Sequence, residues 1–177
     1  MKYIFLTLII VASGCKMDSD KKVDRNKFTY KTGDDTELFF KNIRQSEYDF
    51  EENKAAKFNL FRYEDRVTTQ ETPVLNLAIV INYMKDEAYL LVEPNDILDN
   101  EEVISVTVKD SDLTFELSAF NHQSMLEFAS QIYEQLLLDK NFVVMVNGEQ
   151  TPVLNTLDER EAFRITMSDY YRLVRVY

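Results

Sequence analysis

The amino-acid sequence predicts an α+β fold in which an antiparallel or mixed sheet of about seven to eight strands carries two helices on one face. Residues 38–119 alternate apolar and polar side chains over much of their length, which indicates strands. Near residues 123–139 and 157–174 the apolar positions recur every three or four residues, which indicates helices. Apolar residues make up 45% of the chain, including twelve Phe and ten Tyr, and can fill one core. We therefore expect residues 36–177 to form a single globular domain.

The strands are expected in aromatic or β-branched runs that end at polar turns. Residues 74–84 form the most apolar of these runs and should be the central strand. Asn147-Gly148 fits a two-residue turn and joins the last two strands in a hairpin. The predicted strands are residues 38–50, 58–63, 74–84, 88–92, 103–108, 113–119, 142–146 and 151–155.

The two helices each begin with the spacing of a capping box. Ser124 and Glu127 have this spacing in the first helix, and Thr156 and Glu159 have it in the second. Such a box satisfies backbone N–H groups that the first turn leaves without partners. The apolar positions are Met125, Phe128, Ala129, Ile132 and Leu136 in the first helix, and Phe163, Met167, Tyr170, Tyr171 and Val174 in the second.

The chain is strongly acidic, with 20 Lys and Arg against 31 Asp and Glu and a net charge of −11. A surface of this charge repels phosphate groups, so nucleic acid is not an expected partner. Glycine is scarce, because the whole chain has only three. A phosphate-binding loop or a dinucleotide motif needs several glycines for close backbone approach, so the sequence predicts no cofactor of either kind.

The N-terminus has the parts of a secretory signal peptide. Lys2 provides a positive start, and residues 3–11 form an apolar run too short to cross a bilayer as a stable helix. The small residues Ala12-Ser13-Gly14 then precede Cys15, the only cysteine of the chain. Because signal peptidases cleave after small residues, we expect residues 1–14 to be removed.

The sequence Ala12-Ser13-Gly14-Cys15 resembles the lipobox of bacterial lipoproteins, although Ala12 stands where Leu is usual. The resemblance covers residues 1–15. It implies that Cys15 receives a diacylglyceryl thioether and an amide-linked acyl chain, which would anchor the protein to a membrane of the cell envelope. It also implies the outer membrane, at its periplasmic face or the cell surface, because Lys16 replaces the Asp of the usual inner-membrane retention signal. The alternative is an ordinary secretory signal with a chance cysteine.

Residues 15–35 are expected to connect the lipid to the domain. They mix basic and acidic side chains, contain few aliphatic residues and end in the turn signal Gly33-Asp34-Asp35. This composition favours a flexible tether, which would hold the domain near the membrane without docking it there.

Few residues suit catalysis or metal binding. His122 is the only histidine, and the only cysteine is the expected lipid attachment site, so no zinc site is predicted. Ser124 lies two residues from His122, a spacing at which helical side chains do not face each other, although another serine could approach His122 in the folded chain. Residues 95–102 offer oxygen ligands for calcium, but they lack the EF-hand pattern and equally fit a solvated surface. We predict no catalytic residue and no metal site.

Arginines on the second predicted helix are the best candidates for an interaction surface. Arg and Tyr are enriched where proteins contact partners, because they give directional contacts. We assign Arg164, Tyr171 and Arg172 to this surface. The alternative is that these arginines pair with acidic residues of their own domain, such as Glu161. The four arginines that fall near one stripe of the helix are Arg160, Arg164, Arg172 and Arg175.

These features favour a lipid-anchored protein of the bacterial cell envelope that binds another envelope protein or a surface component without catalysing a reaction. The alternative is a small envelope hydrolase that acts on glycan, peptide or lipid. Glycoside hydrolysis needs only two carboxylates at a suitable separation, so the many acidic residues leave this alternative open. A concave pocket that holds two carboxylates would favour the hydrolase.

Overall fold

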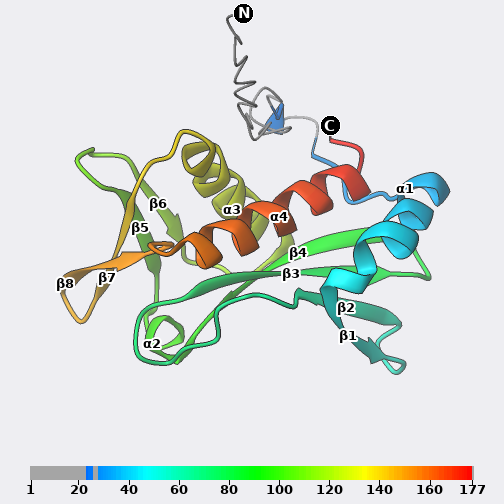
Figure 1. Cartoon of the computed structure of the whole chain (residues 1–177), viewed down its shortest axis with the longest axis horizontal. Helices are drawn as coiled ribbons and strands as arrows, with labels where there is room; N and C mark the ends of the chain where they lie inside the picture. The colour runs from blue at the N-terminus through cyan, green and yellow to red at the C-terminus, as the bar shows by residue number, and fades with distance from the viewer. Residues whose placement is uncertain (1–22, 26–27, 177) are drawn as a thin grey trace, which may run out of the picture.

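The computed structural model describes residues 23–25 and 28–176 and shows an α+β fold with two four-stranded antiparallel sheets (Figure 1). The first sheet contains β1 (Tyr48–Asn53), β2 (Phe58–Tyr63), β3 (Leu75–Asn82) and β4 (Glu87–Pro94), in that spatial order. The second contains β5 (Ile104–Val108), β6 (Thr114–Leu117), β7 (Phe142–Val146) and β8 (Glu149–Val153), in the order β6-β5-β7-β8.

The predicted fold class is confirmed, but the prediction of a single sheet is wrong. A short helix, α2 (Asp96–Asp99), follows β4, and the next strand, β5, pairs with β6 and β7 instead of extending the first sheet. Alternation along a strand specifies which side chains share a face, but it does not specify which strand becomes the neighbour. The two sheets could therefore not be separated by periodicity alone.

Strand β3 lies in the middle of the first sheet, between β2 and β4. Its pairing with β4 runs from Leu75 opposite Pro94 to Asn82 opposite Glu87. One face of β3 contributes Leu75, Leu77, Ile79 and Ile81 to the main hydrophobic core. The other face carries Ala78 and Val80 in a smaller apolar cluster. The apolar run predicted as a central strand is thus buried on both faces.

The second sheet ends in the hairpin predicted at Asn147-Gly148. Both residues have positive φ, 51° and 84° respectively, as a type I′ turn between antiparallel strands requires. The turn joins β7 to β8, whose register runs from Val146 opposite Glu149 to Phe142 opposite Val153.

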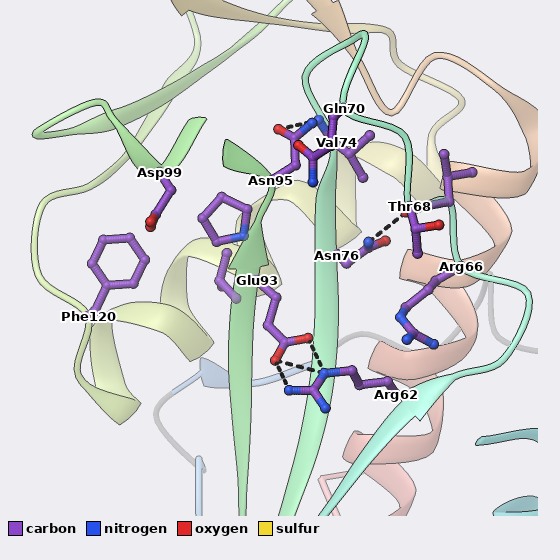
Figure 2. A pocket seen from close by; sticks show the side chains of 13 residues that line it. Arg62, Arg66, Thr68, Gln70, Val74, Asn76, Glu93, Asn95, Asp99 and Phe120 are labelled. Carbon is purple, nitrogen blue, oxygen red and sulfur yellow. Dashed lines mark hydrogen bonds and ion pairs between the residues drawn. The ribbon is translucent and has the colours of Figure 1, made fainter. Parts of the chain in front are cut away.

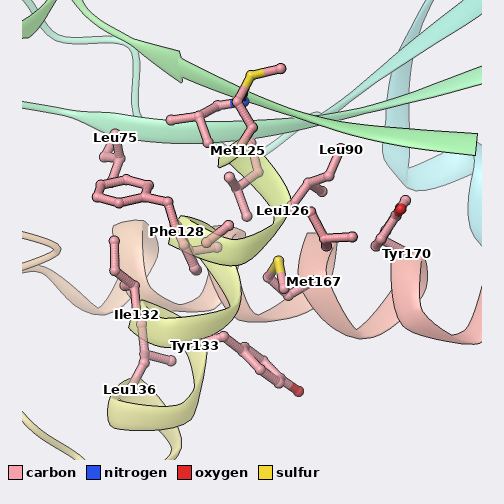
Figure 3. Close-up of a cluster of buried hydrophobic side chains, with 14 of the residues drawn as sticks. Leu75, Leu90, Met125, Leu126, Phe128, Ile132, Tyr133, Leu136, Met167 and Tyr170 are labelled. Atoms are coloured by element: carbon pink, nitrogen blue, oxygen red, sulfur yellow. Dashed lines mark hydrogen bonds between the residues drawn. The ribbon is translucent and has the colours of Figure 1, made fainter. Parts of the chain in front are cut away.

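Two long helices, α3 (His122–Leu137) and α4 (Leu157–Leu173), lie on the same side of β3 and β4 (Figure 3). Helix α4 contacts β3 and β4, whereas α3 contacts β4, β6 and α4, so that α3 links the two sheets. Phe128 of α3 and Met167 of α4 are fully buried between them and the first sheet. The capping box of Thr156 and Glu159 is confirmed. At the start of α3, however, Asn121 is the cap, and its side chain accepts a hydrogen bond from the backbone N–H of Ser124.

The strand predicted at residues 38–50 is wrong for most of its length. The chain forms α1 (Asp34–Phe39), a π-helical turn η2 (Phe40–Arg44) and a 3₁₀ turn η3 (Gln45–Glu47), and β1 begins only at Tyr48. Aromatic content favours strands, but tertiary packing overrides such a preference. Here the Phe40 ring packs against Tyr48 and Phe61, with ring centroids 5.5 and 5.2 Å apart.

The end of the predicted tether belongs to the folded domain. The backbone of Tyr30 accepts a hydrogen bond from Ala88, and that of Thr32 donates one to Asp86, so residues 30–32 lie along the free edge of β4. Helix α1 then begins within the predicted tether. The signal peptide, Cys15 and residues 15–22 lie outside the described residues.

A buried ion pair fastens the helical turns before β1 to α4. The Arg44 Nε atom lies 3.0 and 2.8 Å from the two carboxylate oxygens of Asp169, and the Tyr48 hydroxyl donates to the same carboxylate at 2.8 Å. Asp169 is only 4% exposed. This burial raises the pKa of Asp169 above its usual value, while hydrogen bonds from Arg44 and Tyr48 oppose the rise.

We expect Arg44→Met to lower the free energy of unfolding by about 3 kcal/mol at pH 7, because the variant leaves the buried Asp169 carboxylate with only the more distant Arg172 as a cation. The pKa of Asp169 should rise further in the variant, so its folded state should bind a proton that the unfolded state has released. The loss relative to the unmodified protein should therefore be largest at neutral pH and shrink toward pH 4. Urea denaturation across this range measures it. Lys54→Met, at the exposed Lys54–Glu52 pair, is the control. A loss that does not vary with pH would contradict this account.

Candidate functional site

A polar cleft of about 500 Å³ lies where β2 ends, β3 begins and β4 ends (Figure 2). Its walls come from the loop at residues 64–74, from α2 and from the segment that precedes α3. These parts are distant in sequence, and only the fold brings them together. A volume of this size lies within the range of small-molecule sites.

The floor of the polar cleft is a bridge between β2 and β4. Arg62 donates to Glu93 through Nε at 2.8 and 3.0 Å and through Nη2 at 2.8 Å. The bridge crosses β3 at Ala78, the residue opposite Arg62, whose small side chain leaves room for the guanidinium group. Hydrogen bonds to Glu93 and Glu51 raise the pKa of Arg62 above its ordinary value. The floor is therefore held together by a fixed pair of opposite charges.

One wall of the polar cleft is held in place by two asparagines. The Asn95 side chain donates to the backbone oxygens of Thr69 and Thr72, at 3.1 and 2.7 Å, and accepts from the backbone N–H of Val74 at 3.2 Å. The Asn76 side chain donates to the backbone oxygen of Val67 at 2.8 Å. The side-chain amides of Asn95 and Asn76 thus provide hydrogen-bond partners for loop backbone groups that pair with no neighbouring strand or helix.

Polar and aromatic side chains face each other across the cleft. Figure 2 shows Asp99 and Phe120 on one side and Arg66 and Thr68 on the other. Phe120 is 52% exposed, although it is a large apolar side chain. Within residues 23–25 and 28–176, no hydrogen bond ends on the Asp99 carboxylate or the Thr68 hydroxyl. The cleft therefore offers a ring face together with a carboxylate, a hydroxyl and a guanidinium group.

The polar cleft meets one condition for a hydrolase, since it contains two carboxylates, Glu93 and Asp99. Glu93, however, accepts three hydrogen bonds from Arg62. Such pairing occupies both oxygens of the carboxylate. A general acid must hold a proton, and a nucleophile must present a free oxygen. The observed geometry gives Glu93 neither role.

The interaction residues predicted on α4 do not form one exposed surface. Tyr171 is fully buried, and its hydroxyl donates to Ser130 Oγ at 2.7 Å. Arg164 pairs with Glu161 at 2.6 Å. Arg172 lies 3.4 Å from Asp169 and stacks over the Phe39 ring. Both arginines thus contact groups of their own domain, and Tyr171 lies in the core.

His122 and the acidic run at residues 95–102 show no arrangement suited to chemistry. The His122 ring stacks on Tyr89 with 3.9 Å between centroids, and Ser124 hydrogen-bonds to Asn121 instead. Residues 96–99 of the acidic run form α2, and Asn95 holds the cleft wall. In the described part of the chain, no three His, Cys, Asp or Glu side chains converge as metal ligands would.

Comparisons of the chain with protein-family models, with curated proteins and with solved structures find no match. Among the described helices, none combines the length and the apolar character needed to cross a bilayer. The site must therefore be interpreted from its own geometry.

We expect Asn95→Ala to release the cleft wall while leaving the rest of the domain folded. The substitution removes three hydrogen bonds to the loop, so the free energy of unfolding should fall by about 1–3 kcal/mol. Amide hydrogen exchange at Val74 should accelerate, and proteases should cut residues 67–72 sooner. Asn155→Ala, at an exposed position, is the matched control. Unchanged exchange at Val74 in Asn95→Ala would show that the amide does not hold the loop.

Proposed function

We propose that this protein is a non-catalytic binding module, anchored by lipid to the bacterial cell envelope, whose polar cleft takes a neutral oligosaccharide. The observation that carries the proposal is the cleft itself, in which an exposed Phe120 ring lies among fixed polar side chains. The pairing of Glu93 with Arg62 favours binding over hydrolysis.

The lipid anchor is supported by the sequence Ala12-Ser13-Gly14-Cys15. Residues 23–25 already lie on the domain, because Val23 packs against the core and Arg25 pairs with Glu134 of α3 at 2.5 Å. The eight residue-to-residue steps from Cys15 to Val23 could span at most about 28 Å when fully extended. The acyl chains would thus keep the domain close to the membrane. Lys16 favours the outer membrane as the site of the anchor.

The ligand class follows from the chemistry of the polar cleft. Sugars present a patch of C–H groups that packs on an aromatic face and hydroxyl groups that both donate and accept hydrogen bonds. Phe120 supplies the face, while Asp99 accepts and Thr68 both donates and accepts. Arg66 can donate through the N–H groups that its pairing with Asp49 and the Tyr63 carbonyl, both through Nη1, leaves available. The asparagine-held loop lowers the cost of ordering the site on binding. The negative charge of the chain disfavours polyanionic ligands.

We expect neutral oligosaccharides to bind the polar cleft, and Phe120→Ala to weaken binding by about fivefold, because an aromatic contact contributes about 1 kcal/mol. The probes are maltohexaose, cellohexaose and chitohexaose, with a heparin hexasaccharide as the anionic comparison. NMR titration should shift the amides of residues 66–70, 99 and 120. Phe50→Ala is a matched control, because Phe50 and Phe120 are both 52% exposed and Phe50 lies outside the cleft.

Three outcomes would contradict the proposed ligand. One is the absence of shifts with all neutral probes, the second is stronger binding of the heparin fragment, and the third is cleavage of a probe with release of shorter sugars. The last outcome would instead establish the hydrolase alternative.

We expect Cys15→Ser to move the protein from the membrane pellet to the soluble fraction of a bacterial host, because the substitution removes the thiol that lipidation requires. Intact-mass measurement should show an acylated chain that begins at residue 15 in the unmodified protein. Ser19→Ala, nearby in sequence, should leave both results unchanged. A membrane-free, unacylated protein that retains residues 1–14 would refute the anchor.

A further inference from the structure

An apolar groove of about 510 Å³ lies at the other end of the first sheet, next to α1 and η2. Figure 1 shows α1 and the β1–β2 hairpin at the same end of the molecule. Its floor consists of Phe40, Phe61 and Ile81, which belong to the core. Its rim includes Leu38 and Phe50, which are 59% and 52% exposed. Large apolar side chains that gather around a hollow mark an interaction site more strongly than scattered ones do.

The groove borders β1, an edge strand whose outer side pairs with no described strand. The other described edge strands are each covered, interrupted by proline or short. Residues 30–32 lie along β4, Pro152 interrupts β8, and β6 has only four residues. Strand β1 has six residues, contains no proline and is mostly exposed. Its outer edge can therefore hydrogen-bond to an added strand.

A polar atom in the groove also lacks a partner. The Oδ1 atom of Asn59 is buried and accepts no hydrogen bond from any described residue. Asn59 lies opposite Glu52 of β1, next to the edge, and lines the groove. A buried acceptor without a donor costs free energy, so the sheet next to β1 is less completely hydrogen-bonded than its other described parts.

We propose that β1 binds an extended segment of a partner protein, which pairs with its backbone as a fifth strand of the first sheet. The side chains of such a strand would alternate between the two faces of the sheet. Those on the groove face would be apolar, because they meet Phe50 and Leu38. The proposal is independent of the saccharide assigned to the polar cleft.

Side chains on the opposite face of the added strand would be basic. Asp49 and Glu51 of β1 lie on that face, and their side chains are 59% and 64% exposed even though each already pairs with an arginine, Arg66 and Arg62. A lysine on the neighbouring strand can approach them from the open side. The partner segment is thus an extended chain in which apolar and basic residues alternate.

A second copy of this chain does not fit the same edge. Pairing β1 with another β1 would bring Asp49, Glu51 and Glu52 close to the same acidic residues of the other copy, and like charges on neighbouring strands destabilise a sheet. The net charge of −11 also opposes self-association. Charge complementarity therefore selects a basic partner.

The test uses the mature chain from residue 15, with Cys15→Ser to avoid detergent, and an acetylated, amidated octapeptide of alternating lysine and valine. Binding is followed by calorimetry and by hydrogen exchange of the β1 amides. We expect protection of β1 and weaker binding at high salt. Replacing the lysines with glutamates, or N-methylating alternate backbone nitrogens, should each weaken binding by at least about tenfold.

Paired variants separate the apolar groove from the polar cleft. Leu38→Ser and Phe50→Ala should weaken peptide binding, whereas Phe120→Ala should leave it unchanged. Both groove residues are more than half exposed, so the domain should still fold, which circular dichroism would verify. Equal binding of the glutamate peptide, equal binding of the N-methylated peptide, or protection confined to other strands would overturn the proposal. So would a dimer of the free protein that buries β1, or binding only after removal of residues 15–22.

Discussion

Helix α4 is buried along most of its length, so each of its polar side chains needs a partner inside the protein. Asp169 accepts hydrogen bonds from Arg44 and Tyr48, which attach η2 and β1 to α4. Tyr171 donates a hydrogen bond to Ser130 of α3, which attaches the other long helix to α4. Thr166 donates to the backbone oxygen of Ala162 within α4 itself. The elements that cover the first sheet are thus positioned by the need to provide hydrogen-bond partners for the buried polar side chains of α4.

Periodicity predicted most of the secondary structure, because both long helices and most strands have an apolar face that the core requires. It failed at residues 38–47, where Phe40 and Arg44 serve contacts with β1 and α4 that are distant in sequence. Periodicity also failed to separate the two sheets, since β5 finds β7 across about 35 residues of intervening chain that include α3. Local patterns determine which faces are apolar, whereas pairing depends on the whole chain.

The candidate sites were harder to predict than the fold. The arginines of α4 suggested a surface, but Arg164 and Arg172 are only partly exposed and pair within the domain, and Tyr171 lies inside. The polar cleft gathers residues from three separate segments, 62–76, 92–99 and the stretch at Phe120, so no spacing in the sequence marks it. One signal was present: Asn76 interrupts the most apolar strand, and a polar residue in such a run needs a partner, here the loop at Val67.

The two ends of the described domain are clamped together. The Thr36 hydroxyl donates to the backbone oxygen of Leu173 at 2.8 Å, and Arg175 pairs with Asp35. A nascent chain therefore cannot complete its hydrophobic interior until the final turn of α4 has been released, because Leu173 and Val174 of that turn are buried in the core. Bulk attached close to Arg175 would disturb its exposed pair with Asp35 at the start of α1.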